Sequence, residues 1–187
     1  MSEADERGQR WPPWAAPPAG EVPVPLSERL VLLDSADAAV MLTEFECYST
    51  GLAFWSEVRI RWPFPSGIAD SADLALREHH KRSEAMGSLE LLLRLPQGDP
   101  LSTSDAQGSS RAARIRRPSG PVLVSADSAG GDETSTWANW WLWPMPRAGS
   151  IEFTLRWPAI MRGQTASASV DSTKFHAASR DVIRLWD

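Results

Sequence analysis

Alternation of apolar and polar side chains along three segments constrains the fold of this chain most. Apolar residues occupy nearly every second position of residues 52–62, 89–95 and 151–157, and several intervening positions carry charges, such as Glu152 and Arg156. A period of two is typical of a strand with one buried and one solvated face, which occurs mainly in antiparallel sheets. The alternation therefore predicts a mainly β, antiparallel fold.

Shorter or less regular strands extend this pattern over most of the chain. Ser49-Thr50-Gly51 is typical of a tight hairpin turn, whereas residues 97–110 and 126–134, rich in Gly, Ser and Asp, are expected to be loops. Seven or more short strands favour a two-sheet sandwich over residues 26–187, of the immunoglobulin-like or jelly-roll type. The additional expected strands are 29–34, 39–48, 111–116, 121–126, 135–143 and 165–170.

One or two short helices are expected beside the strands. Residues 70–85 have the composition of roughly three helical turns and lie in a long excursion at 63–87. Asp171 is a suitable cap for a second helix over residues 172–180. After it, Leu185 and Trp186 are expected to be docked, because exposing each would forgo about 2 kcal/mol of burial free energy.

The first 25 residues form a separate arm in this interpretation. They contain Trp11, Trp14 and six prolines, so we expect an extended, polyproline-like segment rather than a helix. The arm is either a strap whose indoles dock on the domain or a ligand for the aromatic groove of a partner. The strap is favoured, because tethered indoles are better buried than exposed.

Tryptophan is unusually frequent, with ten residues in the chain. Trp143-Pro144 and Trp157-Pro158 fall where strands are expected to end, since proline cannot continue a central ladder. The densest cluster gives the best candidate binding site. On a strand, Trp137, Trp141 and Trp143 share one face and Trp140 lies on the other. These indoles serve either core and rim packing or as a platform for a sugar ring, an apolar ligand or a protein partner.

A basic cluster at residues 111–117 includes Arg114 and Arg116 and is the second candidate contact site. It is suited to an acidic partner or a phosphate, or alternatively to an edge strand protected by charge. The formal net charge of −5 and the scattered acidic residues argue against nucleic acid binding, which usually requires a strongly basic face.

No metal or cofactor site is predicted. His79 and His80 are adjacent, so on a helix their side chains diverge by about 100° and cannot chelate one ion together. The chain has three histidines and one cysteine, without the ligand spacing of a zinc site. No Gly-rich segment has the strand–loop–helix context of a phosphate-binding cradle.

No catalytic residues are predicted either. Glu44 and Glu46 share one face of an expected strand, where a solvated position is favoured over the cleft that paired catalytic carboxylates need. Cys47 is expected to point inward together with Phe45 and Met41, without an activating histidine nearby.

Targeting signals are not expected, and the chain is taken as cytoplasmic. Residues 1–10 are polar, unlike a secretory signal, and no apolar run approaches the roughly 20 residues of a membrane span. The single cysteine excludes an intramolecular disulfide.

Several short motifs together resemble a group of Trp- and Pro-rich, mainly β proteins of high-GC bacteria to which no function is assigned. The resemblance implies a fold of this class and no particular activity, and the excursion 63–87 is longer and more polar than in that group. The motifs are the N-terminal arm, Tyr48-Ser49-Thr50-Gly51, Trp141-Leu142-Trp143-Pro144-Met145-Pro146, Trp157-Pro158 and Leu185-Trp186.

Three classes of function remain open on the sequence alone. A non-catalytic protein-interaction module fits best, because a Trp-rich strand and a Pro-rich arm accompany no reactive constellation. A carbohydrate- or small-ligand-binding module using surface Trp is the alternative. An enzyme would require His79, His80 or a carboxylate in a deep pocket.

Overall fold

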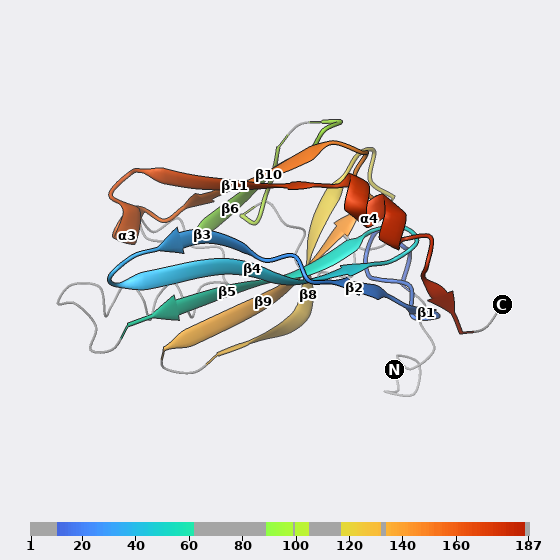
Figure 1. Cartoon of the computed structure of the whole chain (residues 1–187), viewed down its shortest axis with the longest axis horizontal. Helices are drawn as coiled ribbons and strands as arrows, with labels where there is room; N and C mark the ends of the chain where they lie inside the picture. The colour runs from blue at the N-terminus through green and yellow to red at the C-terminus, as the bar shows by residue number, and fades with distance from the viewer. Residues whose placement is uncertain (1–10, 62–88, 99, 105–116, 132–133, 186–187) are drawn as a thin grey trace, which may run out of the picture.

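Antiparallel strands build almost all of the described chain (Figure 1). The computed structural model describes residues 11–61, 89–98, 100–104, 117–131 and 134–185. Every strand pairing within these residues is antiparallel, which confirms the predicted mainly β, antiparallel class. The expected helix at 70–85, the strand at 111–116 and the excursion 63–87 lie wholly or mostly outside the described residues.

The larger sheet has six strands in the order β2-β4-β5-β9-β8, with β3 also paired to β4. Its strands are β2 (Val24–Leu26), β3 (Leu30–Asp34), β4 (Ala38–Cys47), β5 (Leu52–Ile60), β8 (Val122–Gly131) and β9 (Ser135–Trp143). The predicted hairpin joins β4 to β5, where the Tyr48 backbone N–H donates to the Gly51 carbonyl at 3.0 Å.

A four-stranded sheet in the order β11-β10-β6-β7 lies across the larger one (Figure 1). It consists of β6 (Glu90–Arg94), β7 (Leu101–Ser102), β10 (Ser150–Arg156) and β11 (Thr165–Asp171). A two-stranded sheet pairs β1 (Glu21–Val22) with β12 (Ile183–Arg184), and two short helices are α3 (Pro158–Met161) and α4 (Thr173–Ala178).

One apolar core contains inward side chains from both larger sheets. Phe45 of β4 lies at its centre, stacked on Phe54 of β5 and on Phe175 of α4, each with ring centroids 5.7 Å apart. Phe153 of β10 meets Phe45 edge-on at 6.3 Å. The predicted inward positions of 89–95 and 151–157 supply the opposite wall, so the alternation correctly predicts these buried faces.

A β-bulge in β4 changes which residues face the core. Glu44 has a φ of 50°, and the β4–β5 register shifts between Thr43 and Glu46. An extra residue reverses the alternation, so Leu42 and Phe45 are both buried although they are three apart. Cys47 therefore points inward as predicted, whereas the prediction that Met41 shares its face is wrong.

Two further expectations about loops are wrong. Residues 126–131 continue β8, and residues 101–102 form β7. In both places, pairing with a neighbouring strand overrides a composition of small polar residues that has low strand propensity. The arm also differs from an extended polyproline segment, because residues 21–22 and 24–26 join sheets. Pro25 is tolerated because β2 lies at an edge, where a missing N–H breaks no ladder.

The end of the described chain docks through its backbone rather than its side chains. β12 pairs with β1, and the Leu185 N–H donates to the Gly20 carbonyl at 2.9 Å. Leu185 is nevertheless 49% exposed, so the expected burial of this side chain is wrong. The second helix is shorter than expected and its N-cap is Ser172, not Asp171. The Asp171 carboxylate still accepts a 2.9 Å hydrogen bond from the Thr173 N–H at the start of α4.

Candidate functional site

The four clustered tryptophans of β9 have three different environments. The predicted alternation is confirmed, since Trp140 faces the core between the sheets and the other three face outward. Trp140 is only 3% exposed, and its indole Nε1–H donates to Ser56 Oγ at 2.8 Å. A satisfied N–H in a close-packed core makes Trp140 a structural residue.

Trp141 and Trp143 lie beneath the N-terminal arm. Trp141 is fully buried, and its Nε1–H donates to the Pro13 carbonyl at 3.0 Å. Trp143 is half-buried, with its ring 6.1 Å from that of Trp14 in an edge-on arrangement. Of the two arm indoles, Trp14 is thus docked as the strap interpretation expects, while Trp11 is 39% exposed.

Trp137 is the clustered indole that reaches solvent, with 38% of its surface exposed. It pairs across the ladder with Gly130 of β8, and a Cβ on Gly130 would lie 2.8 Å from the Trp137 ring. The missing side chain of Gly130 therefore gives the indole room to lie against β8. Glycine at this position, which looked like a loop signal in the sequence, serves the placement of an aromatic ring.

Trp137 shares the outer face of the larger sheet with three apolar side chains from neighbouring strands. Strand pairing places Val31 opposite Met41, Met41 opposite Glu57, and Glu57 opposite Trp137. Trp55 lies diagonally between Met41 and Trp137, within reach of both side chains. We call Val31, Met41, Trp55 and Trp137 the tryptophan surface. Sequence reasoning missed its members outside β9, because only the strand register brings them together.

Charged groups lie within the tryptophan surface, because Glu57 stands between Met41 and Trp137 in the strand register. Glu57 and Arg59 form an ion pair at 2.6 Å, and the Arg59 side chain is 64% exposed. Arg114 and Arg116 of the predicted basic cluster lie outside the described residues, as do His79 and His80. The relation of this cluster to the tryptophan surface stays a prediction.

An acidic cluster adjoins the arm at the β4–β5 hairpin. Glu21 accepts hydrogen bonds from the Ser49 backbone N–H and hydroxyl, at 2.9 and 2.5 Å. Burial, followed by the negative charge of Glu46, raises the pKa of Tyr48 to about 12, so this phenol stays protonated at neutral pH. Burial and the nearby Glu44 also raise the pKa of Glu46. The cluster holds the start of β1 on the hairpin.

The Cys47 thiol has no nucleophilic character here. It is fully buried, and burial raises its pKa to about 12. Because the thiolate is the reactive form, a thiol held protonated in the core is inert at neutral pH.

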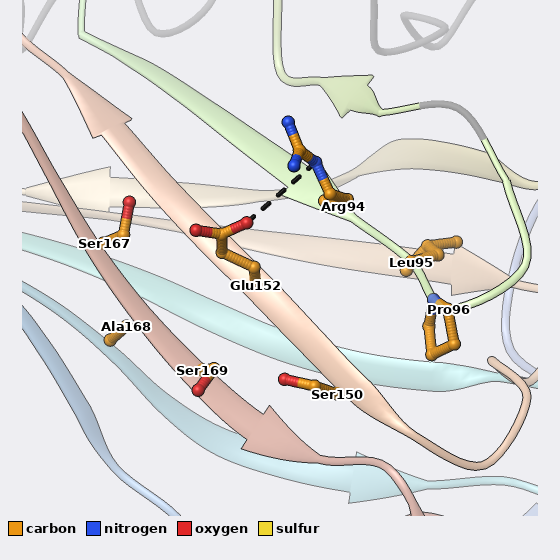
Figure 2. Close-up of a pocket in the computed structure, with 8 residues that line it drawn as sticks. All are labelled: Arg94, Leu95, Pro96, Ser150, Glu152, Ser167, Ala168 and Ser169. Carbon is orange, nitrogen blue, oxygen red and sulfur yellow. Dashed lines mark ion pairs between the residues drawn. The ribbon is translucent and has the colours of Figure 1, made fainter.

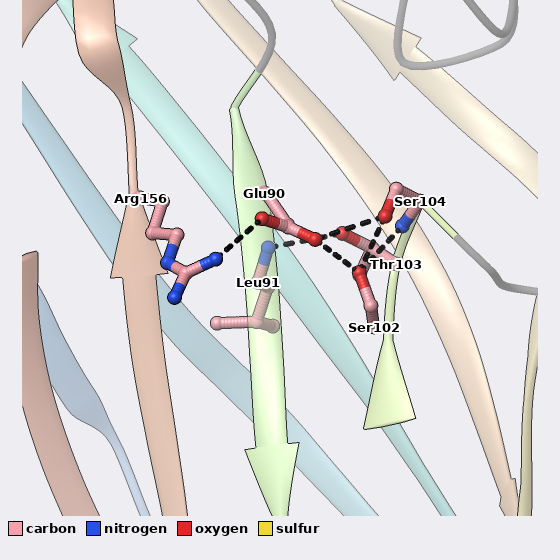
Figure 3. Close-up of polar contacts among 6 residues, drawn as sticks. All are labelled: Glu90, Leu91, Ser102, Thr103, Ser104 and Arg156. Atoms are coloured by element: carbon pink, nitrogen blue, oxygen red, sulfur yellow. Dashed lines mark hydrogen bonds and ion pairs between the residues drawn. The ribbon is translucent and has the colours of Figure 1, made fainter. Parts of the chain in front are cut away.

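A second polar centre lies on the smaller sheet around Glu90 of β6 (Figure 3). Its Oε1 accepts hydrogen bonds from Ser102 Oγ at 2.6 Å and Ser104 Oγ at 2.9 Å, and Oε2 lies 3.6 Å from an Arg156 guanidinium nitrogen. Burial alone would raise the pKa of Glu90, but these hydroxyls and Arg156 together lower it. A carboxylate with a lowered pKa is a weak base for activating serine, so the arrangement suits a structural clamp of β7 on β6.

Glu90→Gln should lower the free energy of unfolding at neutral pH by about 1–2 kcal/mol, because a charged acceptor is lost. A lowered folded-state pKa stabilises the fold above the ordinary value of 4.5, and this contribution disappears as the pH falls through the folded-state value. The difference between wild type and Glu90→Gln should therefore shrink in acid. Urea denaturation at several pH values measures it.

Glu152→Gln is the matched control for Glu90→Gln. Glu152 is 43% exposed and lies 3.9 Å from Arg94, so its removal should change stability by less than about 0.5 kcal/mol. A constant difference between Glu90→Gln and wild type across the acid range would contradict the clamp.

A shallow hollow of about 490 Å³ lies on the outer face of the same sheet (Figure 2). The Arg94–Glu152 pair crosses it, and serine hydroxyls of β10 and β11 form its other polar groups. The lining is Arg94, Leu95, Pro96, Ser150, Glu152, Ser167, Ala168 and Ser169. Since no aromatic ring is among these residues, the hollow lacks the stacking surface on which sugar recognition often depends.

Within the described residues, no group of three or more His, Cys, Asp or Glu side chains is arranged to hold a metal ion. None of the helices in that part of the chain has the length and apolar character that a bilayer crossing requires. No protein family model matches the sequence, and no curated protein or solved structure is significantly similar to it. The resemblance described above stays a prediction.

Proposed function

We propose that this protein is a non-catalytic protein-interaction module whose contact surface is the tryptophan surface. One observation carries the proposal: Trp137 lies against Gly130 with 38% of its surface exposed, while Trp140 and Trp141 are buried. An indole that the sheet already holds in one position has little conformational entropy left to lose on binding. Rigid aromatic side chains of this kind are enriched at binding hot spots.

The neighbours of Trp137 support the same function. The solvated face of an antiparallel sheet normally carries polar side chains, yet this face adds Val31, which is 53% exposed, and half-buried Met41 and Trp55. Exposed and half-buried apolar groups gathered on one face, with the Glu57–Arg59 ion pair among them, are typical of an interaction surface.

We further propose a two-sheet sandwich as the architecture that presents this surface. The shared core of the two larger sheets supports it, because side chains from β4, β5 and β9 meet those of β6 and β10. The part of the outer face that the arm leaves uncovered is then available for contact on a rigid support.

Trp137→Ala should weaken partner binding strongly and leave the fold intact, and Trp11→Ala is its matched control. The two indoles have nearly equal exposure, 38% and 39%, but only Trp137 lies on the tryptophan surface. A protein captured from lysate by wild type is identified and purified, and its affinity for each variant is measured. We expect a loss of at least about 30-fold for Trp137→Ala, equivalent to a hot-spot residue, and little change for Trp11→Ala.

A glycan array probed with wild type, Trp137→Ala and Trp11→Ala distinguishes a carbohydrate-binding module from a protein-interaction module. Sugar binding that disappears in Trp137→Ala would replace the protein partner by a carbohydrate ligand at the same indole. Equal affinity of wild type and Trp137→Ala for every captured partner and sugar would exclude the tryptophan surface as the contact site.

A further inference from the structure

The arm covers a second apolar cluster that is separate from the core between the sheets. Ala53, Val122, Val124 and Trp141 are buried in it, with Tyr48 and Trp143 packed at its border. These side chains belong to the outer face of the larger sheet. We call Tyr48, Val122, Trp141 and Trp143 the arm-binding surface.

The arm occupies this surface with a short segment that is folded in itself. The Ala15 N–H donates to the Pro12 carbonyl at 2.8 Å and closes a tight turn. Within that turn, the Pro13 carbonyl accepts the Trp141 indole N–H, Trp14 meets Trp143 edge-on, and Ala15 is only 4% exposed. Proline fixes the backbone in advance, so little conformational entropy remains to be lost on docking.

Aromatic side chains also line the grooves in which other domains recognise proline-rich peptides, although those peptides bind as extended polyproline helices and this segment binds as a turn. The contacts described above use only residues 12–15 of the arm. They do not depend on the identity of the chain that carries this segment. The same segment of another molecule satisfies them equally well.

We propose that the arm-binding surface is a peptide-recognition surface, on which the Pro12–Ala15 turn of this chain can be exchanged for that of a second copy. The hinge is residues 16–19, because the Gly20 carbonyl accepts the Leu185 N–H, Glu21 is held by Ser49 and β1 is paired with β12. Four residues reach at most about 14 Å, so two exchanging copies face each other and swap arms symmetrically.

Exchange is governed by effective concentration. The contacts are equal within and between copies, and a short tether gives the chain's own turn an effective concentration on the order of millimolar. The chain is therefore self-occupied at micromolar concentration. Weakening the attached turn, or shortening the hinge, opens the surface to a turn supplied by another molecule.

The first test adds a fluorescently labelled peptide of residues 11–16 to the full chain carrying Ala15→Asp. Aspartate at a buried position disables the attached turn and leaves the surface unchanged. We expect the peptide to bind this variant at least tenfold more tightly than wild type, whose own turn competes. A peptide carrying the same Ala15→Asp change should not bind. Adding Trp141→Phe to the Ala15→Asp chain should weaken binding about fivefold through loss of the N–H donor.

The second test keeps every contact of the Pro12–Ala15 turn and removes residues 17–19, which shortens the reach of the arm by about 10 Å. The deletion gives up one backbone hydrogen bond, from the Glu21 N–H to the Pro18 carbonyl. We expect a dimer by light scattering where wild type is a monomer, and a monomer again when Ala15→Asp is added. An Ala15→Asp chain with wild-type circular dichroism that does not bind the peptide overturns the proposal. If Ala15→Asp does not fold, the chain that lacks residues 17–19 provides the test. A dimer of that chain supports exchange, and any other result overturns the proposal.

Discussion

Phe45→Ala is expected to lower the free energy of unfolding by about 3–5 kcal/mol. Phe45 is fully buried at the point where both larger sheets and α4 meet, and it contacts the rings of Phe54, Phe153 and Phe175. Its removal loses the transfer free energy of one ring and three aromatic contacts. It also leaves a cavity that rigid strands cannot close.

Urea denaturation followed by circular dichroism measures this effect, which should also lower the melting temperature by on the order of 10 °C. Val31→Ala is the control, because it removes an apolar side chain that is already 53% exposed. Its loss should stay within about 0.5 kcal/mol. A loss below about 1.5 kcal/mol for Phe45→Ala would show that the sheets do not share the core described here.

Gly51→Ala is expected to cost about 2–3 kcal/mol, through steric overlap rather than a cavity. A Cβ on Gly51 would lie 2.5 Å from the Trp141 ring and 2.6 Å from the Leu142 carbonyl oxygen. The carbonyl belongs to the β9 backbone and cannot rotate away, so the hairpin or the indole must shift. Displacing Trp141 would also weaken its hydrogen bond to Pro13 and loosen the arm.

Acrylamide quenching of tryptophan fluorescence, together with urea denaturation, reports both consequences of Gly51→Ala. Gly98→Ala and Gly120→Ala are matched controls, since a Cβ at either position meets nothing within 4 Å. They should leave stability and quenching close to wild type. Unchanged quenching and stability in Gly51→Ala would contradict the close approach of the hairpin to Trp141.

Local alternation was sufficient to predict the buried faces of β5, β6 and β10, because side-chain direction in a regular strand follows directly from position. It failed at Met41, where the bulge at Glu44 reverses the alternation without a glycine to indicate it. Composition failed in turn at residues 126–131, whose strand conformation depends on the ladder that β9 offers. Both failures arise from pairing with a neighbouring strand, which the residues of one segment alone do not reveal.

For the candidate site too, alternation predicted which face of a strand each side chain occupies, but not how exposed that side chain is. Alternation separated Trp140 from the other three indoles of β9, but their exposure depends on partners elsewhere in the chain. The arm buries Trp141, while Gly130 leaves room for Trp137. Trp55 and Met41 join Trp137 only through the register of three strands, which composition does not reveal.

The pairing of β1 with β12 has a mechanical consequence. Glu21 is paired with Arg184 and Val22 with Ile183, so the segments that leave this ladder, at residues 20 and 185, depart from the same end. A force that pulls these two segments apart opens the hydrogen bonds one at a time, as a zip opens, instead of shearing them together. The two-residue ladder therefore yields at low force, and the larger sheets behind it bear the load only after it has opened.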